Sequence, residues 1–215
     1  MTNKISDLPD DSASSQTQIG QQRPENLTRQ SLIDTNIKGL NEGLELVQLL
    51  NGEQFQQRYK PAFESTVGAH FRHLLEHYRC FLEQLEGGVI CYDDRERDDR
   101  LERDREYALA CISDILQQLQ LLDMDLFDRP YTIKDCQAMT EVATSLEREL
   151  LFLQSHTVHH YALIAAMTRG LGVRPNADFG VAIATQKHRD DCQPGNSDQF
   201  PNDIAHAAEK KTCAQ

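Results

Sequence analysis

Apolar side chains recur at steps of three and four residues in four stretches of the chain, which is the spacing of one face of an α-helix. The first predicted helix ends at Asn51-Gly52, and its apolar stripe is formed by Ile33, Ile37, Leu40, Leu44 and Val47. The second runs from near Ser65 to Gly87-Gly88, and its stripe is formed by Val67, Phe71, Leu74, Tyr78, Phe81 and Leu85. Glycine is typical of helix ends, which supports both boundaries.

The third predicted helix begins within the charged stretch DDRERDDRLERDRE, residues 93–106, and continues to Leu122. Charges of both signs at helical spacing are typical of a solvated face that ion pairs stabilise. In the alternative interpretation, Arg95 and Arg97 contact an anionic ligand. A short extended piece is expected at residues 130–133, and the fourth helix at residues 140–169, ended by Gly170 and Gly172.

Four helices without a convincing β alternation predict an all-α fold, a four-helix bundle. Residues 1–26 and 190–215 are polar and poor in large apolar side chains, so they bury too little surface to offset the entropy of ordering. We therefore expect disordered N- and C-terminal tails. Between them, residues 27–189 are expected to form the bundle and a C-terminal extension.

The composition narrows the partners that the chain can have. A net charge of −12 over 215 residues, without a basic patch, argues against nucleic acid and against an anionic membrane surface. No apolar run approaches the roughly 20 residues that span a bilayer, and the N-terminus lacks the apolar stretch of a secretory signal. We therefore expect a cytoplasmic protein. The six cysteines form no CxxC pair and are expected to be free thiols, with Cys80 and Cys111 in the core.

Six of the eight histidines lie on two of the predicted helices, as VGAHFRHLLEHY and SHTVHHY, residues 67–78 and 155–161. His156 and His160 are four residues apart, so on a helix their side chains share one face. The sequence HTVHH lacks the glutamate of HExxH, which makes a zincin-type protease improbable. Paired surface histidines and single core histidines are common, but burying several imidazoles without partners is costly. A shared metal explains the cluster, and three histidines with open positions describe a catalytic site.

The motifs HxxHLLxH at residues 70–77 and HxxHH at residues 156–160 resemble those of the DinB/YfiT-like family of four-helix bundles with a three-histidine metal centre. The resemblance covers about residues 30–172. By position, it implies that the metal ligands are His73, His156 and His160. Periodicity places His70 and His77 closer to the centre of the apolar stripe than His73, so the ligand on the second helix stays open among these three.

The remaining histidines of the two motifs need other roles. His70, His77 and His159 are expected to position ligands or stabilise the fold, and His77 is also a weak candidate for a general acid or base. An apolar pocket beside the metal could be lined by Phe71, Leu74, Phe152 or Tyr161. Residues 173–185, VRPNADFGVAIAT, either fold back over the bundle and cap the site or stay outside it.

The resemblance implies a divalent-metal-dependent enzyme that activates a low-molecular-weight thiol or water, for transfer or hydrolysis on a small-molecule substrate. A thiol S-transferase and a hydrolase are the two candidate activities. Zinc, nickel, iron and manganese all accept imidazole ligands, so the sequence leaves the metal open. The alternative is a non-enzymatic acidic helical bundle for metal binding or protein interaction. A homodimer formed through an exposed helix face would be ordinary for such a protein.

Overall fold

A computed structural model describes residues 18–58, 60 and 64–192, with side chains from residue 28 onward. The described residues belong to two compact units, divided between Val181 and Ala182. The elements of the first unit are α1 (Gln18–Leu49), α2 (Gly52–Gln56), α3 (Val67–Gln84), β1 (Val89–Ile90), η1 (Tyr92–Asp94), α4 (Arg100–Arg103), α5 (Arg105–Gln120), η2 (Met124–Asp128), β2 (Tyr131–Asp135), β3 (Thr140–Thr144) and α6 (Leu146–Gly170). The second unit contains α7 (Ile183–Asp191).

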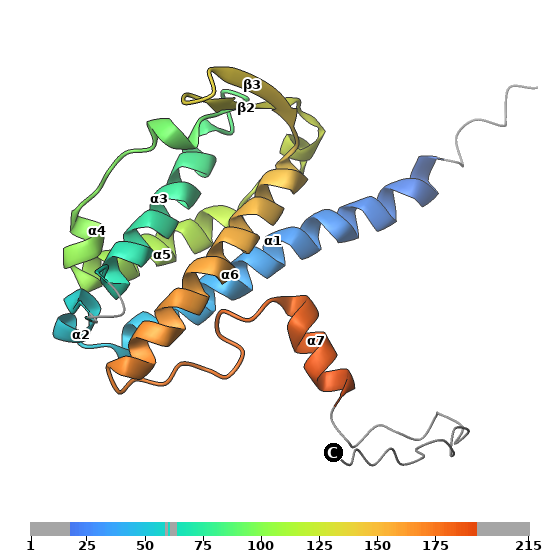
Figure 1. The fold of residues 1–215 in the computed structure, drawn as a ribbon. Coiled ribbons are helices and arrows are strands. Elements are labelled where there is room, and N and C mark those ends of the chain that lie inside the picture. The colour runs from blue at the N-terminus through green and yellow to red at the C-terminus, as the bar shows by residue number, and fades with distance from the viewer. Residues whose placement is uncertain (1–17, 59, 61–63, 193–215) are drawn as a thin grey trace, which may run out of the picture. The chain divides into compact units, whose positions relative to one another are not determined.

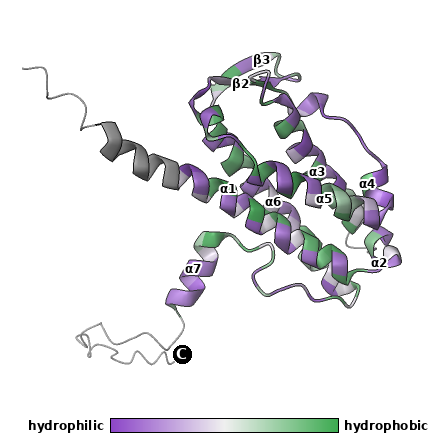
Figure 2. Cartoon of the chain, turned by 180° about the vertical axis from the view of Figure 1, so that it is seen from behind, coloured by the Kyte–Doolittle hydropathy of each residue, from purple (hydrophilic) through white to green (hydrophobic). Residues whose placement is uncertain are grey.

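The four long helices α1, α3, α5 and α6 form the predicted four-helix bundle (Figure 1). Helix α1 packs against α5 and α6, and α3 packs against the same two helices. The first two long helices, α1 and α3, therefore lie diagonally across the core, and α3 and α6 are neighbours. Hydrophobic and hydrophilic residues alternate along these helices (Figure 2), and the buried hydrophobic residues form one core.

The predicted apolar stripes form the core, and hydrogen-bonding residues fix where the helices begin. All six stripe residues of α3 are at most 3% exposed. The Thr66 side chain accepts a hydrogen bond from the Ala69 N–H at 2.9 Å and caps α3. Ser145 caps α6 in the same way, because its hydroxyl accepts from the Arg148 N–H. Such caps satisfy N–H groups that the first helical turn leaves without partners.

A buried polar network crosses the core beside the histidine segment of α6. The Tyr78 hydroxyl donates to Asn36 Oδ1 at 2.7 Å and lies 3.0 Å from the Thr157 hydroxyl. The Asn36 amide donates to the Leu150 carbonyl, and the Thr157 hydroxyl donates to the Leu153 carbonyl. The network links α1, α3 and α6, so it fixes the rotation of α6 one residue from His156.

The expectation that the chain lacks β-structure is wrong. The structure has a three-stranded sheet in the order β1-β2-β3 at the end of the bundle where α6 begins (Figure 1). Strands β1 and β2 are parallel, and β2 pairs with β3 in antiparallel register from Tyr131 opposite Thr144 to Asp135 opposite Thr140. The extended piece expected at residues 130–133 is part of β2.

Residues 140–144, predicted as the start of the fourth helix, are strand β3. The physical reason lies in the alternation of the β-branched residues Thr140, Val142 and Thr144, which suits an extended strand. The helix begins only after Ser145. Its predicted end is confirmed, because α6 stops at Gly170 and Gly172 adopts a positive φ of 80°.

The third predicted helix is interrupted at Asp104, which separates α4 from α5. The Asp104 side chain accepts from the Tyr107 N–H at 3.0 Å and caps α5. Helix α4 approaches α3 closely at Gly68, where an added Cβ would lie 2.2 Å from the Glu102 carbonyl oxygen. Only glycine allows this contact.

Helix α1 begins at Gln18, so residues 18–26, expected to belong to the disordered N-terminal tail, are helical. A helix extends readily from an established segment, because each added residue gains a hydrogen bond without a new nucleation step. Residues 190–191, expected to belong to the disordered C-terminal tail, are the last two residues of α7. Residues 1–17 and 193–215, which contain most of both predicted tails, lie outside the described residues. Among the described helices, none combines the length and hydrophobicity that crossing a membrane requires.

Candidate metal centre

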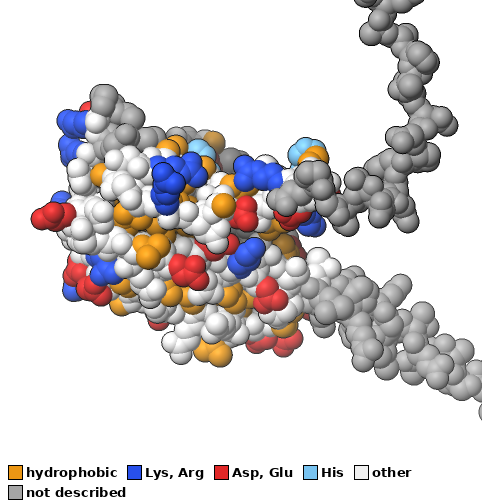
Figure 3. Space-filling model, turned by 90° about the horizontal axis from the view of Figure 1, so that it is seen from below, with side chains coloured by type: hydrophobic (Ala, Val, Ile, Leu, Met, Phe, Trp, Pro, Cys, Tyr) orange, Lys and Arg blue, Asp and Glu red, His pale blue; other side chains and the backbone are white. Residues whose placement is uncertain are grey.

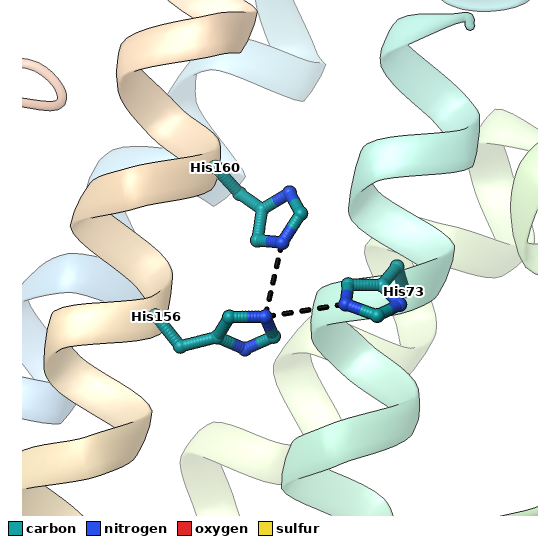
Figure 4. A group of neighbouring side chains, drawn as sticks. All are labelled: His73, His156 and His160. Atoms are coloured by element: carbon teal, nitrogen blue, oxygen red, sulfur yellow. Dashed lines mark hydrogen bonds between the residues drawn. The ribbon is translucent and has the colours of Figure 1, made fainter.

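Three histidines from two neighbouring helices point toward one another (Figure 4). His73 comes from the middle of α3, and His156 and His160 come from successive turns of α6. The ring nitrogens that could ligate a metal all lie within 4.8 Å of one another. The structure therefore brings together the three histidines that the family resemblance selected.

Hydrogen bonds alone cannot account for the short nitrogen–nitrogen distances within this group. His156 Nε2 lies 3.2 Å from His73 Nε2 and 3.0 Å from His160 Nε2. A nitrogen of neutral imidazole offers either one N–H or one lone pair, both in the plane of the ring. His156 Nε2 can therefore form one well-directed hydrogen bond, but it has two nitrogen neighbours.

A divalent cation fits this arrangement. Nitrogen ligands about 2.0–2.1 Å from a tetrahedral ion lie about 3.3 Å from one another, close to the two separations found here. The partial burial of all three side chains also agrees with ligation, since unpaired imidazole nitrogens are costly where water is largely excluded. His73, His156 and His160 could thus hold a divalent ion with their Nε2 atoms.

His70 supports His160 from the side opposite the cluster. When the Nε2 of a neutral His160 ring carries its lone pair, the proton resides on Nδ1, which donates to His70 Nδ1 at 3.0 Å. This contact holds the orientation of His160 and is compatible with the tautomer that leaves Nε2 free to ligate. His159 is exposed on the outer face of α6 and lies outside the group.

The clustered imidazoles are held in their neutral form. Burial, followed by the positive charges of His77 and Arg95, lowers the pKa of His73 from 6.5 to about 4. Burial and the charge of His73 lower the pKa of His156 to about 4. Burial and the charge of His156 lower the pKa of His160 to about 3. Neutral imidazole is the form that ligates metals, so the group is ready for a cation at neutral pH.

His77 lies beside the cluster with a defined tautomer. Its Nδ1–H donates to the His73 carbonyl at 2.7 Å, so Nε2 of the neutral ring carries the lone pair. Its ring centroid is 4.4 Å from those of His73 and His156. Burial lowers the pKa of His77 to about 4. A pKa of about 4 leaves this ring unprotonated at neutral pH, which disfavours the predicted role of general acid. The role of general base stays a prediction.

Aromatic rings form one wall of the cluster. The Phe152 ring stacks on His156 at 5.6 Å, and the Tyr92 ring stacks on His77 at 5.4 Å. The Tyr92 hydroxyl donates to the buried carboxylate of Glu149 at 3.0 Å. Burial and the nearby Glu149 raise the pKa of Tyr92, so this hydroxyl stays protonated.

Three of the four residues expected to line a pocket lie within the core and are at most 1% exposed: Phe71, Leu74 and Tyr161. The rings of Phe71 and Tyr161 pack together at 6.0 Å, and Leu74 belongs to the same apolar cluster. Phe152, only partly buried, is the member of the predicted set that contacts a clustered histidine.

The segment after α6 returns to the bundle as far as Val181, the last residue of the first unit. The Phe179 ring stacks on Tyr161 at 4.3 Å. Gly180 has a φ of 73°, and an added Cβ would lie 2.4 Å from the Ala162 nitrogen, so this position requires glycine. The predicted fold-back thus exists for residues 173–181, and capping of the site stays a prediction.

Sequence reasoning missed a buried carboxylate that organises the charged stretch before α4. Glu76 is 2% exposed, and its Oε1 accepts from the Asp98 N–H at 2.9 Å. Its Oε2 lies 3.6 Å from Arg95 Nε and 3.8 Å from an Arg97 nitrogen. The Arg95 side chain is only 10% exposed and close enough to lower the pKa of His73, His77 and His156.

On the face in Figure 3, acidic and basic side chains are interspersed.

Comparison with known proteins gives a family and a fold. A family model described as the DinB superfamily matches residues 39–164, more than half of the chain. The DinB-like protein YjoA of Bacillus subtilis is 16% identical with a TM-score of 0.50, over 66% of this chain and 92% of that one. YfiT of Bacillus subtilis, a probable metal-dependent hydrolase with an unusual four-helix bundle topology, is 17% identical with a TM-score of 0.51, over 66% and 87%. At identities of 16% and 17%, these two structural similarities show the fold alone.

A curated relative is much longer than this chain. FK506-binding protein 5 of Rhizopus delemar is 26% identical over 163 residues, which cover 73% of this chain. The matched part covers 37% of that relative.

Proposed function

The chain belongs to the DinB superfamily, and from this premise we propose that it is a divalent-metal-dependent enzyme. It activates a low-molecular-weight thiol or water, for transfer or hydrolysis on a small molecule. The observation that carries the proposal is the approach of His73 and His160 Nε2 to within 3.2 and 3.0 Å of His156 Nε2. We assign these three residues as the metal ligands.

The chemistry divides between the metal and the side chains around it. A divalent ion on three neutral imidazoles is a Lewis acid, which lowers the pKa of water or a thiol. His77, whose ring centroid lies 4.4 Å from those of His73 and His156, would be the group that takes the proton of the nucleophile. Phe152 and Tyr92 exclude water on one side and offer an apolar surface to an organic substrate.

Elemental analysis of the purified full chain tests the ligand assignment. We expect the histidines to hold about one divalent ion per chain, and the identity of this ion decides between zinc, nickel, iron and manganese. His156→Ala and His160→Ala should lose the ion while keeping the helical circular dichroism spectrum. His159→Ala is the matched control, since this exposed residue belongs to the same motif but not to the cluster. Equal metal content in the parent protein and in all three variants would overturn the assignment.

A screen of small thiols against electrophilic substrates, with ester and amide hydrolysis measured alongside, separates the two reactions. A transferase consumes the thiol in proportion to product and needs the metal, whereas a hydrolase turns over without any thiol. A protein that binds metal but accelerates neither reaction would favour the non-enzymatic metal-binding bundle.

A further inference from the structure

Two cysteines and an aspartate meet at one edge of the small sheet, apart from the histidine cluster. Cys91 directly follows β1, Asp94 ends η1, and Cys136 directly follows β2. The two sulfur atoms lie 3.3 Å apart although 45 residues separate them in the sequence. The Cys136 thiol points to Asp94 Oδ1 at 3.9 Å. One donor atom from each residue lies within 4.8 Å of the other two.

Hydrogen bonds fix the backbone on both sides of this group. The Cys91 N–H donates to Gln84 Oε1 at 2.6 Å, and its carbonyl accepts from the Cys80 thiol at 3.3 Å. The Cys136 N–H donates to Asp93 Oδ2 at 3.1 Å. Both cysteines are therefore held in place before any ligand arrives, which lowers the entropic cost of binding one.

We infer that Cys91, Cys136 and Asp94 form a second cation site, which binds a thiophilic divalent ion such as Zn²⁺ or Cd²⁺. In a tetrahedral zinc site two thiolate sulfurs lie about 3.7 Å apart, and a sulfur and a carboxylate oxygen about 3.5 Å. The separations of 3.3 and 3.9 Å found here differ from these by less than half an ångström. Binding releases the two thiol protons, and the thiolates and the carboxylate surround the cation with opposite charge.

The two sulfurs are not bonded to each other, so both thiols are free to ligate a cation. A disulfide needs an S–S distance of about 2.05 Å, so the sulfurs would have to approach by more than 1 Å, whereas ligation requires them to separate slightly. A disulfide would also leave the Asp94 carboxylate without a role.

A cation bound by Cys136 and by Cys91 and Asp94 would link the β2–β3 hairpin to the segment that contains Tyr92. Tyr92 follows Cys91 in the sequence, stacks on His77 and donates to Glu149. Occupancy of the second site would therefore stabilise the aromatic wall of the histidine cluster without contributing a ligand to it.

Titration of the reduced full chain with Cd²⁺ tests the inference, followed by the ultraviolet charge-transfer absorption of cadmium–thiolate bonds. Imidazole ligands do not give this absorption, so the second site is seen separately. We expect the band to saturate at one equivalent in His156→Ala, to disappear in Cys136→Ser, and to persist in the control Cys111→Ser. Asp94→Asn, which keeps both sulfurs, should weaken Cd²⁺ binding by at least about tenfold.

Two results would overturn the inference. One is a charge-transfer band that is absent from the parent protein or unchanged in Cys136→Ser. The other is a Cys91–Cys136 disulfide in protein isolated without reductant, found by peptide mass spectrometry, together with no Cd²⁺ uptake by these thiols after reduction.

Discussion

The histidine centre should bind metal almost equally well at pH 7 and at pH 5.5. A metal competes with protons for imidazole nitrogens, so affinity falls when the pH approaches the pKa of the metal-free ligands. Burial and neighbouring positive charges lower these pKa values to about 4 for His73 and His156 and about 3 for His160. Because the pKa values are lowered, the ligands stay neutral to lower pH, and proton competition begins only near pH 4.

The expected effect is large compared with that for ordinary histidines. Each ligand multiplies the apparent Kd by one plus 10 to the power (pKa − pH). Three exposed histidines of pKa 6.5 would thus weaken binding about 600-fold between pH 7 and pH 5.5. With pKa values of about 4, 4 and 3, the same change of pH weakens binding by only about 1.1-fold.

Isothermal titration calorimetry with Zn²⁺, in buffers that do not bind zinc, measures the apparent Kd at both pH values. Cys136→Ser serves as the parent for this experiment, so that the cysteine group does not add to the heat. A histidine-tagged peptide of unfolded sequence provides the reference with ordinary pKa values. A rise of more than about tenfold in the Kd of the protein would refute the reasoning, because it requires ligands that titrate close to pH 6.

Three further predictions follow from hydrogen bonds and burial. Tyr78→Phe leaves Asn36 Oδ1 without its buried donor and should lower the free energy of unfolding by about 1–3 kcal/mol, seen as a lower urea midpoint with an unchanged m-value. His70→Ala removes the acceptor of His160 Nδ1–H and should weaken Zn²⁺ binding by about 10–100-fold, whereas His159→Ala should not. The metal-free protein should lose stability as the pH falls from 6.5 toward 4, because in this range the histidines of the unfolded chain bind protons and those of the folded protein do not. An unchanged urea midpoint over this range would contradict this prediction.

The sequence allowed the bundle to be predicted because its signal is local. Stripes at helical spacing, as from Val67 to Leu85, mark the buried face of each helix regardless of what packs against it. Gly170 and Gly172 mark the end of α6 for the same reason. The break at Asp104 was missed because the charges around it suit a continuous exposed helix. The contact that fixes α4, between Gly68 and Glu102, joins distant parts of the chain.

The histidines could be recognised as a group, but their individual positions could not. Periodicity placed His77 nearer the apolar stripe, and it is indeed 6% exposed. Its Nδ1–H donates to the His73 carbonyl, while His73 itself points across to α6. Which of two neighbouring imidazoles points to the other helix depends on the rotation of both helices, and this rotation is a property of the packed core.

The wall around the histidines was not predictable from local pattern. Tyr92 lies in a short irregular segment, and Glu149 lies in the charged first turns of α6, where an exposed side chain is the usual expectation. Glu149 is buried because the hydroxyls of Tyr92 and Thr144 both donate to it. Such burial becomes favourable only once the sheet has formed, since an unpaired carboxylate in the core is costly.

The division of the three histidines between α3 and α6 has a consequence for how the proposed metal would bind. His73 and His156 are 83 residues apart, and the helix that completes the centre is the last of the bundle to leave the ribosome. A nascent chain that has emerged only as far as α5 holds His70, His73 and His77 without their partners from α6. A metal held by all three histidines would therefore be fully coordinated only after α6 packs on α3, and it would stabilise the folded bundle by binding to it.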